Sequence, residues 1–277
     1  MIKNNRRIII YTCMIFLLTT IGAGAAPKAD LWQVWEDFDS EKPADDLHAP
    51  WHDFLGKYVV VDPDGINLVW YGQVSGKDRE TLDKYIETLA ALPVTDLSRA
   101  EQLAYWINLY NSLTIRLILE HYPVASIRDI DISPGFFADG PWDKKLVRIE
   151  GRQVSLNDIE HRILRPIWKD PRIHYAVNCA SLGCPDLQPV AFTAANTLEL
   201  FDKGAGDYIN HRRGVTFRDG RLIVSSIYEW FKDDFGGSDA GVIRHVRKYA
   251  RPALGEKLKK ADHIADDRYD WSLNGAE

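Results

Sequence analysis

The chain has 277 residues, of which 45% are hydrophobic and 27% are charged, so it is long enough for one large domain with a buried core. Its formal net charge of −6 at pH 7 argues against nucleic acid and anionic lipid as partners, because both are themselves negatively charged. Nine tryptophans and twelve tyrosines predict a large aromatic core, with a carbohydrate- or peptide-binding groove as the alternative.

The N-terminal segment has the three parts of a secretory signal. An apolar run at 8–21 stands between small residues at 23–25 and a basic region made of Lys3, Arg6 and Arg7. This run is shorter than the roughly 20 residues that a membrane-spanning helix needs. We therefore predict a signal peptide at 1–25, a periplasmic or extracellular protein, and no stable membrane span after cleavage.

The rest of the chain predicts an α+β fold. An extended acidic arm at 26–48 leads into one globular domain at 49–277, because no Pro/Gly/Ser-rich linker divides that range. Apolar spacing predicts helices at 51–58, 78–92, 98–121, 155–164 and 196–210, one opening at Ser226, and one at 240–249. Alternation and turn residues predict strands at 59–61, 66–71, 146–149, 153–154, 172–177, 215–217 and 222–224. Helices and hairpins mix without a βαβ rhythm, which is typical of α+β domains.

The helix expected at 98–121 is the most apolar and should be central, with one broad face toward the core. Asn108 and Asn111 lie near or on that face. A buried amide without hydrogen bonds costs roughly 1–3 kcal/mol, so both must find partners. They either tie the helix to a neighbouring loop or line a pocket.

Four motifs, in order between residues 104 and 235, resemble those of the domain-of-unknown-function 547 family. They are AYWINLYN at 104–111, SLNDIEH at 155–161 with Arg165, RIHYAVNC at 172–179 continuing to GCP at 183–185, and SSIYEW at 225–230 with Asp234 and Phe235. The resemblance implies a shared fold with its core motifs at 98–249 and a shared polar cluster. It implies no established activity.

Cys179 and Cys184 are the only cysteines outside the predicted signal peptide. In an exported protein, two cysteines this close in sequence predict a disulfide that fixes the shape of their loop. The chain-entropy gain from so short a loop is only about 2 kcal/mol. The alternative is a nucleophilic Cys179, whose thiolate requires a nearby base or another stabilising group.

His161 and His174 are the candidate bases, since histidine titrates near neutral pH. If 172–177 is a straight strand, the Cα atoms of His174 and Cys179 are about 16 Å apart. His161 comes from a different element and is then the better partner. Glu160 or Asn111 would orient the base.

Further polar residues are expected around this cluster as binding candidates. They are Asn108, Arg165, Arg172 and Asp234, with Asp234 pairing with one of the two arginines. Zinc-competent side chains occur nearby, but their spacing fits neither the paired C-x₂-C pattern nor HExxH, so we predict no metal site and no cofactor.

The sequence leaves three functions open. A non-catalytic binding or scaffold role in the cell envelope is placed first. The second is a thiol-type hydrolase or transferase that acts on an amide or ester through Cys179, and the third is a metal-dependent hydrolase. The expected partner is a small molecule, a peptide or an envelope component.

Overall fold

The computed structural model describes residues 27–40, 47–135 and 140–277. The predicted signal peptide at 1–25 lies outside the described residues, as does the stretch 41–46 of the acidic arm. Across the described ranges, no helix combines the length and the apolar character that crossing a membrane requires.

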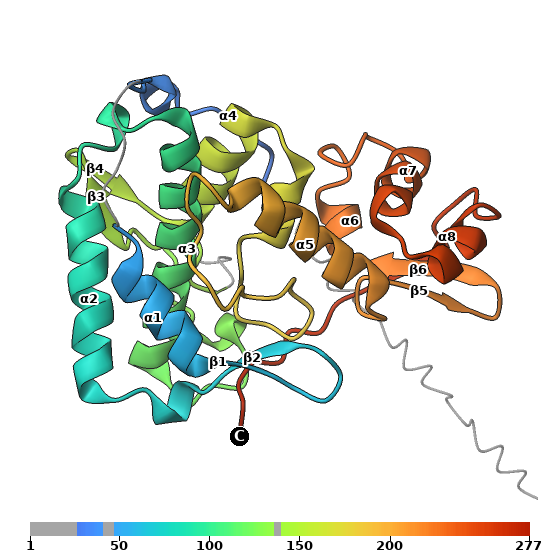
Figure 1. Cartoon of the computed structure of the whole chain (residues 1–277), viewed down its shortest axis with the longest axis horizontal. Coiled ribbons are helices and arrows are strands. Elements are labelled where there is room, and N and C mark those ends of the chain that lie inside the picture. The colour runs from blue at the N-terminus through green and yellow to red at the C-terminus, as the bar shows by residue number, and fades with distance from the viewer. Residues whose placement is uncertain (1–26, 41–46, 136–139) are drawn as a thin grey trace, which may run out of the picture.

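The elements follow one another along the chain as a mixture of helices and short hairpins (Figure 1). The α-helices of the described chain are α1 (Ala49–Tyr58), α2 (Gly76–Ala91), α3 (Arg99–His121), α4 (Arg165–Trp168), α5 (Thr197–Asn210), α6 (Ile227–Trp230), α7 (Asp239–Tyr249) and α8 (Pro252–Leu258). The strands are β1 (Val59–Val61), β2 (Asn67–Val69), β3 (Val147–Ile149), β4 (Arg152–Val154), β5 (Val215–Arg218), β6 (Arg221–Ser225) and β7 (Asp266–Arg268). Short 3₁₀ helices are η1 (Gln33–Glu36), η2 (Tyr71–Gln73), η3 (Val94–Asp96), η4 (Ile127–Asp129) and η6 (Pro171–Tyr175), and η5 (Asp158–Leu164) is a π-helix.

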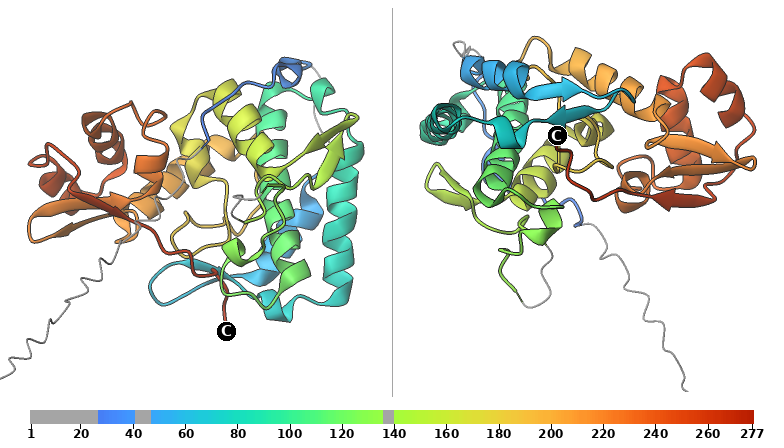
Figure 2. Two further views of the ribbon diagram at one scale, coloured as in Figure 1. Left: turned by 180° about the vertical axis from the view of Figure 1, so that it is seen from behind. Right: turned by 90° about the horizontal axis from the view of Figure 1, so that it is seen from below.

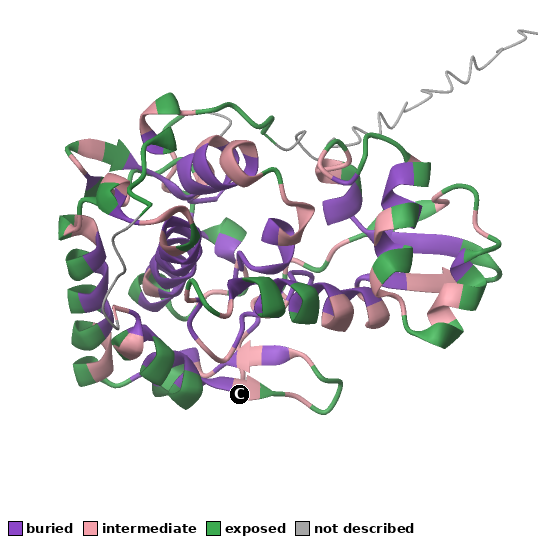
Figure 3. Cartoon of the chain, turned by 45° about the horizontal axis from the view of Figure 1, so that its top comes forward, coloured by how far each residue is buried: buried purple, intermediate pink, exposed green. Residues whose placement is uncertain are grey.

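Helix α3 is the centre of the larger half of the molecule (Figures 1 and 3). It begins with a capping box, in which the hydroxyl of Ser98 accepts from the backbone N–H of Glu101 and the carboxylate of Glu101 accepts from that of Ser98. We expected one apolar face, but every residue from Gln102 to Leu119 except Arg116 is buried. The reason is that other elements cover the helix on all sides, as a helix at the middle of a core requires.

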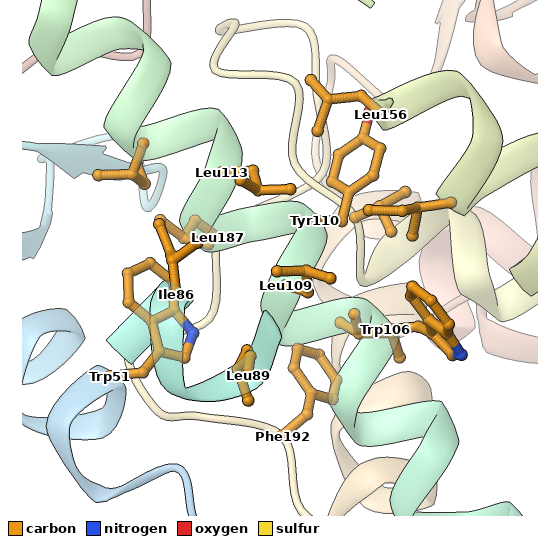
Figure 4. Packing of buried hydrophobic residues seen from close by; sticks show 14 of the residues in the cluster. Trp51, Ile86, Leu89, Trp106, Leu109, Tyr110, Leu113, Leu156, Leu187 and Phe192 are labelled. Atoms are coloured by element: carbon orange, nitrogen blue, oxygen red, sulfur yellow. The ribbon is translucent and has the colours of Figure 1, made fainter. Parts of the chain in front are cut away.

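Three further parts of the chain pack around α3 in the main core (Figure 4). Trp51 comes from α1, and Ile86 and Leu89 come from α2. Leu187 and Phe192 come from the long loop between η6 and α5. Helix α2 presents the apolar residues of its predicted spacing to this core, and the residues on its other side are exposed to solvent (Figure 3).

The smaller half of the molecule has a second core cluster. Strands β5 and β6 pair antiparallel, and β7 joins β6 in parallel. The β5–β6 hairpin turns at Asp219 and Gly220, whose φ values of 51° and 75° give the two left-handed positions that a two-residue turn of this kind requires. Helix α5 connects the halves, since Phe201 packs in the main core and Tyr208 in the second. The described chain is a single α+β domain, as predicted.

The strand predicted at 172–177 is wrong, because the chain forms the 3₁₀ helix η6 there. Pro171 begins this helix, and the carboxylate of Asp170 accepts a hydrogen bond of 2.9 Å from the backbone N–H of Arg172. These local contacts favour a helical turn. An alternation of polar and apolar residues over only six positions does not exclude such a helical turn.

Both described ends of the chain are fastened to the larger half. Near the N-terminus, the backbone N–H of Asp30 donates to the carbonyl of His161 at 2.9 Å. At the other end, the chain leaves β7 and runs back across the molecule (Figure 2). In this tail, residues 269–277, the N–H of Asn274 donates to the carbonyl of Ala180 at 3.2 Å and that of Leu273 to the carbonyl of Ala125 at 2.8 Å. The tail therefore brings residues that are distant in sequence next to the two cysteines.

Candidate functional site

A pocket of about 330 Å³ lies where the two core clusters meet. Six aromatic rings line it, namely Tyr110, Trp142, Trp230, Phe231, Tyr269 and Trp271. Five of the predicted site residues also line it: Glu160, His161, His174, Cys179 and Cys184. A concave, largely apolar pocket with a few converging polar groups is the usual form of a ligand site.

Cys179 is a free, partly exposed thiol in the wall of this pocket. Its sulfur lies 2.9 Å from the hydroxyl of Tyr269 and 3.3 Å from the hydroxyl of Ser181. The pKa of Cys179 is lowered, first by a hydrogen bond from the Cys184 thiol and then by those from Ser181 and Tyr269, although burial opposes the shift. Three donors around one sulfur favour the thiolate, which is the nucleophilic form.

Cys184 is buried behind Cys179 and is also a free thiol. The backbone N–H of Cys179 donates to its sulfur at 3.2 Å. Burial raises the pKa of Cys184 well above its ordinary value. The structure thus holds the reduced pair in contact, and the disulfide remains a prediction for the oxidised protein.

The loop that carries the cysteines is held by one asparagine. The Asn178 side chain accepts from the N–H of Ala180 at 2.9 Å and donates to the carbonyl of Pro185 at 2.8 Å, so it joins the two ends of the loop. Ala180 has a φ of 56°, a left-handed conformation that is uncommon for residues other than glycine. This conformation reverses the chain after Cys179 and turns it back toward Cys184.

Helix α3 supports the start of this loop. The Asn111 side chain donates to the carbonyl of Ala176 and accepts from the N–H of Asn178, both at 2.8 Å. Asn108 makes the same pair of bonds to one residue, Phe192, at 2.7 and 3.0 Å. Both asparagines therefore tie α3 to loops. Only Asn111 reaches the cysteine loop, and neither of them is among the residues that line the pocket.

A buried charge network forms the other side of the pocket. Nε2 of His174 lies 2.7 Å from Oδ2 of Asp234, and Nδ1 lies 3.6 Å from Oε1 of Glu160. Arg165 pairs with the same Asp234 oxygen at 2.6 Å through Nε and contacts Nδ1 of His161 at 3.0 Å through Nη1. Two carboxylates, one guanidinium and two imidazoles thus share one site, as the sequence predicted for Arg165 and Asp234.

The surroundings shift the pKa values of the two histidines in opposite directions. Burial opposes the charge on His174, but hydrogen bonds with Asp234 and Glu160 outweigh it and raise the pKa of His174. Burial and the neighbouring charge of Arg165 together lower the pKa of His161 to about 4, against the attraction of Glu160. His161 is therefore neutral near pH 7. Because Arg165 donates to its Nδ1, its proton is on Nε2.

Glu160 and Asp234 remain ionised despite their burial. Burial opposes the charge on Glu160, but His161 (protonated only below about pH 4), the hydrogen bond with His174 and the charge of Arg165 bring the pKa of Glu160 down to about 2. Hydrogen bonds from His174 and Arg165 likewise hold the pKa of Asp234 well below its ordinary range. With His174 protonated, the network has equal positive and negative charge, which reduces the cost of burying it.

Residues 94–209 match the family described as "Protein of unknown function, DUF547". The search of curated proteins found no match, and the search of solved structures found none either.

The DUF547 match covers most of the residues that line the pocket. It includes α3, η5, η6 and both cysteines, which agrees with three of the four motifs seen in the sequence. The fourth motif, at 225–235, lies beyond the matched residues. Trp230 and Tyr269, in the part of the chain that follows, complete the pocket.

Some predicted site residues are not brought together. Arg172 pairs with Asp170 and Asp202 instead of Asp234 and does not line the pocket. Neither histidine makes a hydrogen bond with Cys179 within the described chain, so the structure has no Cys–His dyad. In the same described ranges, no three His, Cys, Asp or Glu side chains are arranged to hold a metal ion.

Sequence reasoning missed the residues that act directly on the thiol. Ser181 lies between the two cysteines, and a hydroxyl in a turn is too common to mark a site. Tyr269 lies in the charged C-terminal stretch, 90 positions after Cys179. Only the returning tail shows that this residue belongs to the pocket.

Proposed function

We propose that this protein is a thiol-dependent hydrolase or acyltransferase that acts on esters or amides, with Cys179 as its nucleophile. The observation that carries the proposal is the position of the Cys179 sulfur, which is partly exposed in a pocket and contacted by the hydroxyls of Tyr269 and Ser181. These donors take the place of a contacting base, because they stabilise the thiolate directly.

In the proposed reaction, the thiolate attacks the carbonyl carbon and the carbonyl electron pair moves to the oxygen. The Nε2–H of His161 faces no hydrogen-bond partner in the described chain and is the group that we assign to that oxyanion. A neutral imidazole with its pKa lowered is suited to donate a hydrogen bond in this way. Collapse of the intermediate breaks the bond to the leaving group, which takes a proton from water and departs as an alcohol or amine, and a thioester is left on Cys179. Water or an acceptor alcohol or amine then attacks the thioester carbonyl, and the Cys179 thiolate leaves.

This assignment changes the expected role of the two histidines. Both nitrogens of His174 face carboxylates, so this residue orients the network and has no lone pair available for a base. His161 has its proton on the nitrogen that is left for the substrate. Glu160 lies 3.6 Å from Nδ1 of His174 and helps to hold the ring of His174 in place.

The test is acylation of the reduced protein by p-nitrophenyl esters of increasing chain length. We expect an early release of nitrophenol and an added acyl mass on the peptide that contains Cys179. Cys179→Ser should lose both signals. Asp202→Asn, which changes an exposed partner of Arg172 away from the pocket, should keep both. A variant without Cys179 that still releases nitrophenol at the full rate would refute the proposal.

A non-catalytic binding domain is the second candidate, and the aromatic wall favours it. Trp271 packs against Trp142 and Trp230 with ring centroids 5.7 and 5.6 Å apart, and all three are only half-buried. Such rings bind sugars, peptides and apolar chains without any reaction. If this is the function, a ligand found by tryptophan fluorescence will bind equally well to Cys179→Ser, and no acyl adduct will form.

We also propose that the protein works outside the cytoplasm. The basic, apolar and small-residue order of the first 25 positions supports this. Expression of the full chain in a secreting host, followed by N-terminal sequencing of the exported form, tests it. Retention of the intact N-terminus inside the cell would contradict it.

A further inference from the structure

Cys179 and Cys184 differ in their exposure and in the hydrogen-bond partners of their sulfur atoms. Cys179 is partly exposed to the pocket, whereas Cys184 has only 5% of its surface exposed. The sulfur of Cys179 has two hydroxyl neighbours, and that of Cys184 has the backbone N–H of Cys179. Both thiols line the pocket, and Cys179, the more exposed of the two, is placed to react first with molecules that enter it.

A purely structural disulfide would add little here. Closing a loop this short stabilises the fold by roughly 2 kcal/mol in the chain-entropy account. The loop is also held in its shape without a bond between the sulfurs. Arg213 donates to the carbonyls of Leu182 and Cys184 at 3.1 and 2.9 Å, and the N–H of Gly183 donates to Asp270 at 2.8 Å. The reduced pair is thus kept in contact by the surrounding chain.

We propose that Cys179 and Cys184 form a dithiol–disulfide couple that exchanges electrons with disulfides entering the pocket. Cys179 is the attacking thiol and Cys184 the resolving thiol. The co-reactant is an organic disulfide, either a small one or one on a protein. This activity is separate from acyl transfer and does not depend on it.

The exchange proceeds in two displacements. The Cys179 thiolate attacks one sulfur of the external disulfide, whose S–S bond breaks as a mixed disulfide forms on Cys179 and the first thiolate leaves. Cys184 then loses its proton to water, and its sulfur attacks that of Cys179. The second external thiolate leaves, and both leaving groups take up protons. Two electrons pass from the two cysteines to the external disulfide, which becomes two thiols.

The local contacts suit both displacements. The hydroxyls of Tyr269 and Ser181 stabilise the thiolate that attacks, and burial keeps Cys184 protonated until a mixed disulfide forms beside it. When Cys184 is deprotonated, the N–H of Cys179 at 3.2 Å is already in place as a donor to its sulfur. An exposed attacking thiol with a low pKa and a buried resolving thiol are the arrangement that this chemistry favours.

The experiment is equilibration of the full chain with glutathione and glutathione disulfide at a series of ratios. Free thiols are then trapped with an alkylating reagent, and peptides are mapped by mass, which also separates Cys13 from the pair. We expect a single two-electron transition to a bond between Cys179 and Cys184. Cys184→Ser should lose that bond and retain glutathione on Cys179, while Cys179→Ser should lose both products at this site.

Two outcomes would overturn the proposal. One is a wild-type protein that keeps glutathione on Cys179 while Cys184 stays open to alkylation. The other is a folded protein in which neither cysteine is modified at any ratio. Ester cleavage measured on the same reduced samples separates this proposal from the acyl-transfer one, because either activity can be present without the other.

Discussion

The hydroxyl of Tyr269 lies 2.9 Å from the sulfur of Cys179, although the two residues are 90 positions apart. The same hydroxyl lies 2.8 Å from that of Ser181, so one phenol and one alcohol face the thiol together. Tyr269 reaches this position because the tail returns across the cysteine loop (Figure 2). The reactivity of Cys179 therefore depends on the last residues of the chain.

Tyr269→Phe should slow alkylation of Cys179 by iodoacetamide at pH 7 roughly tenfold, since a hydrogen bond to a charged acceptor is worth about 1.5–3 kcal/mol. In the wild type, the pH midpoint of alkylation should lie below the usual thiol value of about 8.5, because the thiolate is stabilised. In Tyr269→Phe, the pH midpoint of Cys179 alkylation should be higher than in the wild type. Tyr122→Phe, at an exposed tyrosine, is the matched control and should leave the profile unchanged. An unaltered midpoint in the Tyr269 variant would show that its hydroxyl does not stabilise the thiolate.

Asn111→Ala and Asn108→Ala form a pair that separates stability from reactivity. Each removes two buried hydrogen bonds from α3, so each should lower the free energy of unfolding by roughly 2–4 kcal/mol. Only Asn111 supports the cysteine loop, so only its loss should change the alkylation rate of Cys179. Urea denaturation gives the first quantity and timed alkylation the second. Equal effects on Cys179 in the two variants would contradict the assigned role.

Asp234→Asn should lower the free energy of unfolding by roughly 3 kcal/mol, because it leaves the buried charges of Arg165 and His174 without their shared partner. Asp202→Asn breaks an ion pair whose carboxylate is well exposed and should cost at most about 1 kcal/mol. Denaturation of both variants by urea makes the comparison.

The effect of Asp234→Asn should also depend on pH. The raised pKa of His174 contributes stability that is fully present below its unfolded pKa of about 6.5 and is lost as the pH rises through the folded pKa. Asp234 supplies much of that shift. The variant should therefore be more strongly destabilised at pH 6 than at pH 9. A loss that is the same at both pH values would mean that His174 is not charged in the folded state.

Gly183→Ala should displace the tail. A Cβ at this position would lie 2.7 Å from the backbone nitrogen of Asp270 and 2.9 Å from Cδ1 of Tyr269, closer than packing permits. We expect a lower melting temperature, faster proteolysis near the C-terminus and slower alkylation of Cys179. A Cβ added at Gly206 in α5 would have no atom within 4 Å, so Gly206→Ala should instead stabilise the protein by roughly 0.5–1 kcal/mol. Unchanged proteolysis of the tail in the Gly183 variant would contradict the close approach.

Local signals predicted most of the fold. Capping residues such as Ser98, and the turn at Asp219 and Gly220, fix element ends through neighbouring backbone groups, so the sequence alone could place them. The strand prediction at 172–177 was wrong because a local backbone contact decides that segment as well. The hydrogen bond from the Arg172 N–H to Asp170 is a short-range contact that an alternation rule does not register.

For the candidate site, too, the sequence predicted some features and the tertiary structure decided others. The sequence determined which residue types are available to it, Glu160, His161, His174 and the two cysteines, because they lie in motifs that can be read position by position. Only the tertiary structure decided their surroundings: the pKa of His161 is lowered beside Arg165, that of His174 is raised between two carboxylates, and Cys179 faces Tyr269. Protonation depends on burial and on charges within a few ångströms, and those neighbours come from segments that only folding brings together.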